Sequence, residues 1–178
     1  MKVNLSIYNN DWYKPGSVLK RILWYYTSLI FFKSGWFPIY RLKVFLLKIF
    51  GAKLGHGVLI KPYVNIKYPW FLTIGNNVWL GEDVWIDNLA QVTIGNDVCI
   101  SQGALLLTGS HNHKSNSFEL NVKAIIIENG VWICAKAIIC AGVRCNEQSI
   151  VTAGSVISED CEANYIYKGN PAIKIKSR

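Results

Sequence analysis

From residue 54 onward, hydrophobic positions recur every six residues along the chain. The segments "IGNNVWL" at 74–80, "IGNDVCI" at 94–100 and "IENGVWI" at 127–133 are three copies of one unit. After the third copy, aliphatic and small residues continue at the same interval as two series. The first series is Ile127, Ile133, Ile139, Cys145, Val151 and Ile157, and the second is Val131, Ala137, Val143, Ser149, Ser155 and Cys161. This period fits neither an amphipathic helix nor a simple alternating strand, and it is typical of a parallel β-helix of hexapeptides.

Each hexapeptide is expected to form one short strand and one turn, so that three hexapeptides close a triangular coil. The two series would then point inward, and coils stacked at the strand spacing of about 4.8 Å would bury one another. The predicted fold class is therefore all-β, with the β-helix at 54–166 and a C-terminal tail at 167–178.

Three departures from the six-residue interval mark outward loops. The intervals 66–74 and 86–94 each span eight residues and so contain two extra residues. The interval 106–127 spans 21 residues, more than a full coil of 18, and we expect it to contain a polar loop at 107–124. Because loops on rigid scaffolds often carry function, this loop is the first place to look for a site.

The loop holds two of the three histidines, His111 and His113, within "LLLTGSHNHKSN". An unperturbed imidazole titrates near neutrality, which suits a general base that removes a proton from a hydroxyl group. We therefore predict that His111 is catalytic. His113 is either a residue that orients His111 or binds the acceptor, or a solvated loop residue, and His56 is expected to be a turn residue.

Residues 1–53 lack the repeat and are predicted to form a basic, aromatic helical region. The apolar run at 22–32 is too short for a membrane span, which needs about 18 residues or more. No small-residue cleavage site follows it, as a secretory signal would require. A second stretch, which ends at Gly51, carries apolar residues at helical spacing, namely Leu42, Phe45, Leu46 and Ile49. We expect two short helices within 17–50 that either pack on the main body or lie on a membrane surface.

Charge and cysteine content refine this picture. The hydrophobic fraction of 51% is enough for a core, and the net charge of +8 is unevenly distributed. Residues 1–61 hold ten Lys and Arg against one acid, whereas residues 62–178 hold nine against ten. Such a basic segment often meets phosphate or anionic lipid, or is simply solvated.

The five cysteines form no CxxC pair and no zinc spacing, so they are interpreted as small buried residues of a reducing, cytoplasmic compartment.

Several motifs resemble those of hexapeptide-repeat acyltransferases, in particular the colanic-acid-type acetyltransferases of exopolysaccharide clusters. They are "IGNDVCISQGALLLTGSHN", "VWICAKAIICAGV", "AGSVIS" and "YKGNPA", together with "FLLKIFGAKLGHGVLIKP" before the repeats. The resemblance covers roughly residues 40–178. It implies a left-handed β-helix, a homotrimer, and an active site between neighbouring subunits, where acetyl-CoA lies in the groove between two helices.

The resemblance also implies roles for single residues. His111 corresponds to the family's loop histidine, Trp132 to a tryptophan near the active site, and Ala135 to the residue whose backbone N–H polarises the thioester carbonyl. Trp132 either contacts the coenzyme or the acceptor or packs at a subunit interface. The pantetheine arm is expected near Ala153. The nucleotide end is expected near Gly169, Asn170, Pro171 and Ala172.

Two departures concern the coenzyme phosphates. Many relatives carry a cation where this chain has Glu159 or Ile173. Nearby lysines could take over the binding of the phosphates, namely Lys168, Lys174 and Lys176.

Together these features predict an acetyl-CoA-dependent O-acetyltransferase that acts by direct transfer on a sugar hydroxyl in surface polysaccharide biosynthesis. The expected acceptor is a lipid-linked or nucleotide-linked saccharide, with a peripheral contact at the inner membrane face and no nucleic-acid partner. An N-acetyltransferase acting on an amino sugar is the main alternative. An acyl-enzyme on Cys134 or Cys140 is a further route, although neither has a histidine beside it in the sequence. No metal is expected, since the metal-dependent carbonic anhydrases of this fold need three histidines around one ion.

Overall fold

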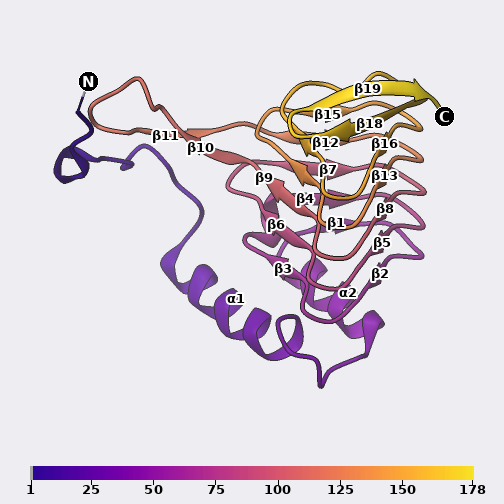
Figure 1. Cartoon of the computed structure of the whole chain (residues 1–178). Coiled ribbons are helices and arrows are strands. Elements are labelled where there is room, and N and C mark those ends of the chain that lie inside the picture. Colours follow the sequence, from indigo (N-terminus) through magenta and orange to yellow (C-terminus); the bar gives the residue numbers. More distant parts are fainter. Residues whose placement is uncertain (1) are drawn as a thin grey trace.

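The computed structural model describes residues 2–178, which form a solenoid of short parallel strands with three faces (Figure 1). The first face consists of β1 (Lys53–Leu54), β4 (Leu72–Ile74), β7 (Val92–Ile94), β12 (Ile125–Ile127) and β15 (Arg144–Cys145). The second face consists of β2 (Leu59–Ile60), β5 (Trp79–Leu80), β8 (Cys99–Ile100), β13 (Trp132–Ile133), β16 (Ile150–Val151), β18 (Tyr165–Gly169) and β19 (Ala172–Ser177). The third face consists of β3 (Asn65–Ile66), β6 (Trp85–Asp87), β9 (Leu105–Leu107), β14 (Ile138–Ile139) and β17 (Val156–Ile157).

The register of the strands and the burial of the repeat residues confirm the predicted parallel β-helix. Trp132 lies opposite Cys99 of the preceding coil and Ile150 of the following coil, in parallel pairing. Every member of the two six-residue series is at most 2% exposed. The core is therefore the inside of the solenoid, filled by the side chains that the period predicts.

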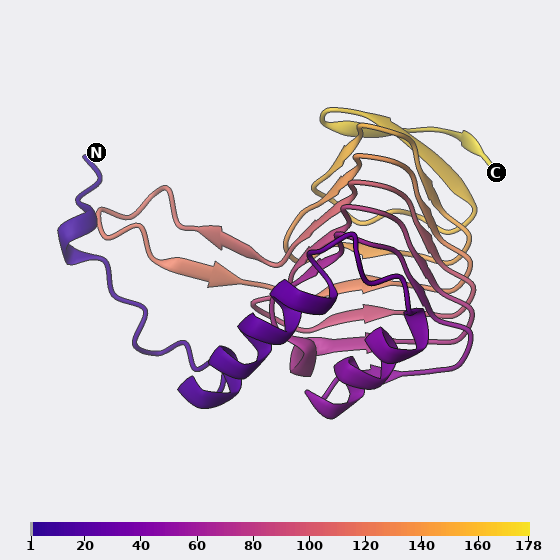
Figure 2. The same ribbon diagram turned by 90° about the horizontal axis from the view of Figure 1, so that it is seen from below.

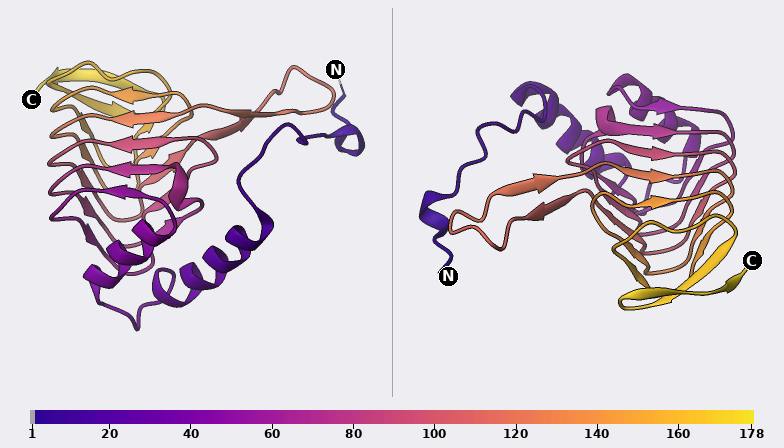
Figure 3. Two further views of the ribbon diagram at one scale, coloured as in Figure 1. Left: turned by 180° about the vertical axis from the view of Figure 1, so that it is seen from behind. Right: turned by 90° about the horizontal axis from the view of Figure 1, so that it is seen from above.

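All three departures from the period lie at one corner, where the chain passes from the third face to the first. We call the segments 67–71, 87–91 and 107–124 the loop corner; the first contains a 3-10 helix, η2 (Pro69–Phe71). The interval 106–127 contains the predicted loop but no complete coil, because β9 and β12 lie on adjacent faces and only one step separates them. The extra residues form an antiparallel hairpin, β10 (Gly109–His111) and β11 (Leu120–Val122), which projects from the solenoid (Figures 1 and 3).

Hydrogen bonds of two fully buried polar side chains hold the segments of the loop corner together. The Asn88 side-chain oxygen accepts a hydrogen bond from the Tyr68 N–H at 3.0 Å, and its amide donates to the Tyr68 carbonyl at 2.7 Å. The Thr108 hydroxyl donates to the Asp87 carbonyl at 2.9 Å and accepts from the Ala90 N–H at 3.0 Å. Since Thr108 lies between β9 and β10, these bonds fix the base of the hairpin.

Two helices, α1 (Val18–Phe31) and α2 (Tyr40–Ile49), cover the end of the solenoid that the first coil would otherwise leave open (Figure 2). The Trp24 indole donates to the Ile66 carbonyl at 2.9 Å, and the Lys43 ammonium donates to the Lys61 carbonyl at 3.1 Å. The helices thus supply donors to carbonyls on the unpaired edge of the first coil. Within residues 2–178, no helix is long and apolar enough to cross a membrane.

The apolar stripe of α2 does not coincide with the face that packs on the solenoid. Phe45 and Ile49 are 58% and 61% exposed, whereas Lys43 and Leu47 are fully buried against the first coil. The buried face carries Lys43 because the coil edge offers a carbonyl to an ammonium donor.

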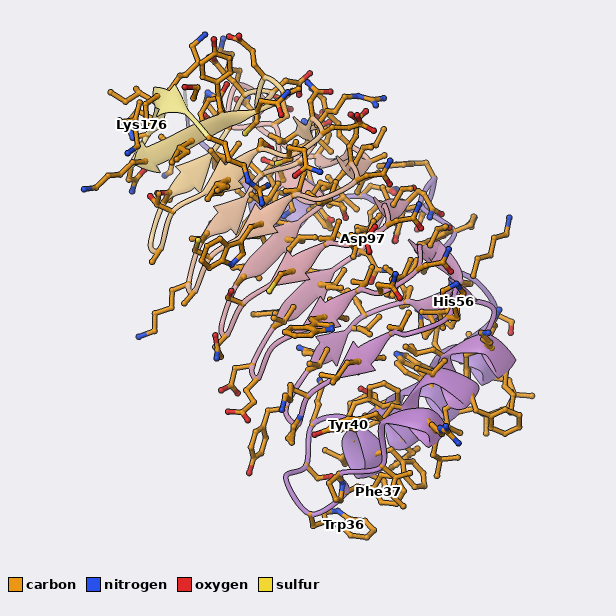
Figure 4. All side chains as sticks on the ribbon, turned by 90° about the vertical axis from the view of Figure 1, so that its right-hand side faces the viewer. Trp36, Phe37, Tyr40, His56, Asp97 and Lys176 are labelled. Atoms are coloured by element: carbon orange, nitrogen blue, oxygen red, sulfur yellow. The ribbon has the colours of Figure 1, made fainter. Side chains whose placement is uncertain are left out.

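The opposite end is closed by the hairpin of β18 and β19, which includes the residues expected as a tail. Figure 4 shows Trp36 and Phe37 at the helical end of the molecule and Lys176 at the other.

Candidate active site

His111 ends strand β10 with its imidazole half-buried and oriented by Phe118 on the opposite side of the hairpin. The two rings stack with centroids 4.3 Å apart and planes 5° apart, and Nδ1 lies 2.9 Å from the Phe118 carbonyl oxygen. A carbonyl only accepts hydrogen bonds, so this contact requires the proton on Nδ1. In the neutral imidazole, Nε2 is then the unprotonated nitrogen, which is the arrangement that a general base needs.

The hairpin tip is held by the carboxylate of Glu119. It accepts hydrogen bonds from the Ser117 and Ser115 hydroxyls at 2.6 and 2.8 Å, and from the Asn112 amide at 3.2 Å. These bonds, first among them that from Ser117, lower the pKa of Glu119. Phe118 lies within this network at a left-handed φ of 51°, which is uncommon for a bulky residue and persists only where the surroundings enforce it.

The N-terminal arm, residues 2–17, runs from the hairpin tip back to the solenoid (Figure 2). The Asn4 N–H donates to the Asn116 carbonyl at the tip, at 2.8 Å. The Tyr13 hydroxyl donates to the Leu89 carbonyl of the loop corner at 2.6 Å. Burial raises the pKa of Tyr13 well above its usual range, so this phenol remains a neutral donor.

The N-terminal arm places Tyr8 near His111, a contact that the sequence did not indicate. The Tyr8 ring centroid lies 5.9 Å from that of His111. The end of the arm before α1 is fixed by the Trp70 indole, which donates to the Pro15 carbonyl at 2.9 Å.

His111 lies between two cavities, one on each side of the hairpin. The arm cavity, between the N-terminal arm and the loop corner, has a volume of about 600 Å³. Besides His111, its aromatic and basic lining residues are Tyr8, Tyr13, Lys14, Arg21, Lys67 and Tyr68. The hairpin cavity, of about 550 Å³, is lined by His111, the exposed His113, Lys114, Lys123 and Cys140, among others. His111 therefore forms part of the wall of both cavities.

The residues expected to contact the thioester and the pantetheine lie elsewhere, where the second face turns into the third. Trp132 is 44% exposed on β13, and its indole donates to the Ser101 hydroxyl at 2.9 Å. Ala135 and Ala153 occupy equivalent turns of successive coils, since the Gly154 N–H donates to the Ala135 carbonyl at 3.0 Å. Within residues 2–178, the N–H groups of Ala135 and Ala153 make no hydrogen bond, so both can donate to a ligand.

The residues expected at the nucleotide end continue along the second face. Lys168 is exposed on β18 opposite Ile173, and Gly169 begins the turn through Asn170 and Pro171 to β19. The Lys174 ammonium is paired with the Glu162 carboxylate at 2.7 Å, which raises the pKa of the lysine. Lys168 is therefore the more accessible cation of the two.

Within one chain the candidate residues form two separate groups. The hairpin of β10 and β11, which carries His111 and His113, projects from one side, whereas β13, β18 and β19 lie on the opposite side (Figure 1). Trp132 and residues 168–174 belong to these strands and the turn between β18 and β19, and Ala135 and Ala153 lie in the turns that lead from the second face to the third. His56 occupies a turn between β1 and β2, where its N–H donates to the Asn76 side chain. In the part of the chain that the structure describes, no three His, Cys, Asp or Glu side chains come together as a metal site would require.

The cysteines named as candidates are poorly suited to nucleophilic attack. Burial raises the pKa of both Cys134 and Cys140, which disfavours the reactive thiolate.

The chain is similar to named acetyltransferases over most of its length, although no family model matches it. It is 38% identical over 168 residues to the putative colanic acid biosynthesis acetyltransferase WcaF of Escherichia coli, covering 93% of this chain and 91% of that protein. It is 30% identical over 134 residues to the galactoside O-acetyltransferase of Escherichia coli, covering 74% and 66%.

Two solved structures share the fold. The hexapeptide-repeat acetyltransferase VCA0836 of Vibrio cholerae matches with a TM-score of 0.81 at 25% identity, over 89% of this chain and 90% of that one. A galactoside acetyltransferase in complex with coenzyme A matches with a TM-score of 0.73 at 25% identity, over 89% and 80%.

Proposed function

The chain belongs to the hexapeptide-repeat acetyltransferases, in the group of the colanic acid biosynthesis acetyltransferases, and on this premise we propose that it transfers the acetyl group of acetyl-CoA to a sugar hydroxyl. The observation that carries the proposal is the orientation of His111. Its Nδ1 is held by the Phe118 carbonyl at 2.9 Å, which leaves Nε2 free to accept a proton between the two cavities.

In the proposed reaction, the acceptor oxygen attacks the thioester carbonyl carbon while Nε2 of His111 takes the hydroxyl proton. The C–S bond then breaks, and the imidazolium returns the proton to the leaving thiolate. Coenzyme A departs as a thiol and the sugar carries the acetyl ester. The free N–H of Ala135 is suited to stabilise the negative charge that develops on the carbonyl oxygen.

The proposed active site is completed by a second copy of the chain. The hairpin that carries His111 projects from the solenoid (Figure 3), at the corner between the third and first faces, whereas Ala135 follows β13 of the second face. A hairpin must therefore reach the second face of a neighbouring copy to bring the two residues together. A closed ring of three copies repeats this heterologous contact three times and yields three equivalent sites. Trp132 then lies at the seam, and Ala153, Lys168 and the turn 169–171 extend the coenzyme path along the second face.

We assign the acceptor saccharide to the arm cavity. Its tyrosines, Tyr8 and Tyr13, offer apolar ring faces and hydroxyl groups, which suit a sugar, and His111 forms part of its wall. His113 is exposed on the other side of the hairpin, where it is accessible to a substrate that enters from there.

We further propose that the enzyme works in the cytoplasm and contacts an anionic membrane through its helical end. Large apolar side chains are exposed there, including Leu19 at 67%, Leu23 at 52%, Trp36 at 68% and Ile49 at 61%. Residues 1–61 supply the basic charge that an anionic lipid surface attracts.

The membrane proposal is tested by flotation with vesicles that contain anionic lipid. The double substitution Leu19→Glu and Leu23→Glu should abolish co-flotation without unfolding the protein, because both side chains are more than half exposed. Loss of the trimer with unchanged flotation would instead assign this surface to a neighbouring copy.

The catalytic proposal is tested by His111→Ala in an assay of thiol release from acetyl-CoA, with saccharides and amino sugars as acceptors. We expect kcat to fall by about 10²- to 10⁴-fold, with the thermal midpoint, the oligomeric state and the KM for acetyl-CoA nearly unchanged. His56→Ala removes an exposed turn imidazole and should leave kcat at the wild-type value. Full activity of His111→Ala would exclude the histidine, and release with amino sugars alone would indicate N-acetylation.

A further inference from the structure

A second cavity adjoins the arm cavity along helix α1, and its polar groups are incompletely satisfied. It has a volume of about 350 Å³ and shares three wall residues with the arm cavity, Arg21, Lys67 and Tyr68. We call it the helix cavity. The shared wall makes the two cavities neighbouring parts of one tract that begins at His111 and continues along α1.

Unsatisfied buried polar atoms are concentrated in the helix cavity. Within residues 2–178, four buried side-chain polar atoms lack a hydrogen-bond partner, and three of them belong to its lining: Arg21 Nε, Ser28 Oγ and Asp87 Oδ1. For Asp87 the ion pair with Lys67 Nζ, at 2.9 Å, compensates. Arg21 and Ser28 have no such partner, and buried groups in native proteins are rarely left in that state without a bound water, an ion, a ligand or a functional role.

The walls of both cavities carry more positive than negative charge. Their charged residues are Lys14, Arg21, Lys33, Lys67 and Asp87. The one carboxylate, Asp87, is already paired with Lys67, so Arg21 remains without a counter-ion among the described residues. Helix α1 begins at Val18, two residues after cavity residue Gly16, and its dipole adds positive potential at this point.

We propose that Arg21, supported by Lys67 and Lys14, binds a phosphate group attached to the acceptor saccharide. A planar guanidinium with free donors matches phosphate oxygens in bidentate geometry, which a lysine does not provide. This inference rests on the proposed sugar acetyltransferase function. The sugar ring lies against Tyr8 and Tyr13 beside His111, its phosphate lies at the shared wall, and the group beyond the phosphate extends into the helix cavity toward the exposed apolar side of α1. The substrate class is therefore a phosphate-linked or diphosphate-linked sugar, not a neutral glycoside.

Two variants test the phosphate site. Arg21→Gln removes the unpaired cation, and Arg41→Gln is the matched control, since Arg41 is an exposed arginine on α2 that lines neither cavity. The assay follows thiol release with three acceptors that carry the same sugar: a methyl glycoside, a nucleoside-diphosphate sugar and a prenyl-diphosphate sugar in detergent. We expect Arg21→Gln to lower kcat/KM for the diphosphate acceptors by about 10- to 100-fold, while the methyl glycoside and the control variant are unaffected.

Binding of inorganic diphosphate, measured by calorimetry, gives a readout that does not depend on turnover. The wild type and Arg41→Gln should bind it, and Arg21→Gln should bind at least tenfold more weakly. Preference for the prenyl or the nucleoside acceptor identifies the source of the phosphate, and both outcomes support the site. Equal losses of Arg21→Gln on neutral and phosphorylated acceptors, or no diphosphate binding by the wild type, would overturn it. Diphosphate binding without acetylation of any sugar would instead refute the proposed function and leave the anion site standing.

Discussion

The hydroxyl of Thr108 links the solenoid to the base of the hairpin that carries His111, and Thr108→Val tests this link directly. The substitution keeps the shape of a fully buried side chain but removes two hydrogen bonds. The Ala90 N–H loses its partner, which costs about 1–3 kcal/mol, and the lost bond to the Asp87 carbonyl adds about 1 kcal/mol. The Asp87 carbonyl keeps other donors, namely the Leu89 and Thr108 N–H groups, so it adds no further penalty.

We therefore expect Thr108→Val to lower the free energy of unfolding by about 2–4 kcal/mol, which for a chain of this size lowers the midpoint by about 4–16 °C. Thermal unfolding followed by circular dichroism measures the shift, and kcat should fall with it because the hairpin base loosens. Thr108→Ser retains the hydroxyl and should lose far less. Thr73→Val serves as the matched control, since the Thr73 hydroxyl is half-buried and accepts only from the Gln91 side chain. A midpoint for Thr108→Val within about 2 °C of the wild type would show that these bonds do not hold the hairpin.

Two further predictions concern the helical cap and the hairpin tip. Trp24→Phe removes the indole donor of the Ile66 carbonyl and should cost about 1–3 kcal/mol by denaturant titration; an unchanged midpoint would mean that the cap does not protect the coil edge. The carboxylate of Glu119 has a lowered pKa, so its stabilisation is present above the ordinary range of glutamate and is lost as the pH falls through the lowered value. The protection of the hairpin amides against hydrogen exchange, relative to their intrinsic exchange rate at each pH, should therefore fall in acid, and Glu119→Gln should show the lower protection already at neutral pH; equal protection in both proteins would refute the role of the network.

The sequence was sufficient for the solenoid because its signal is local and repeated. A buried position every six residues specifies which side chains point inward, and Ile127, Val131 and their successors are all buried as expected. The apolar spacing of α2 predicted a helix but not the face that packs on the solenoid. Lys43 is buried there to donate to a backbone carbonyl, and a lysine gives no apolar signal.

The six-residue period also indicated part of the corner that carries the candidate site. The intervals 66–74 and 86–94 fall at the corner where the hairpin begins. When successive coils are aligned by their six-residue repeats, the extra residues of these intervals lie beside the loop, and Lys67 and Leu89 come near His111. The contributions of Tyr8, Tyr13 and Phe118 could not be found in this way. The two tyrosines reach the site through contacts between the arm and distant segments, and Phe118 acts through its backbone carbonyl and left-handed φ.

The claim on which the proposed mechanism depends is that each active site combines the hairpin of one copy with the second face of another. It is tested most directly by mixing two inactive variants. His111→Ala removes the base, and Ala153→Trp fills the proposed coenzyme path at an exposed turn, where a large side chain should not disturb folding. Co-refolded in equal amounts, the two should recover about a quarter of the wild-type activity, because a native hairpin and a native second face meet by chance at one site in four. Mixed assemblies that stay as inactive as either variant alone would contradict a site shared between copies.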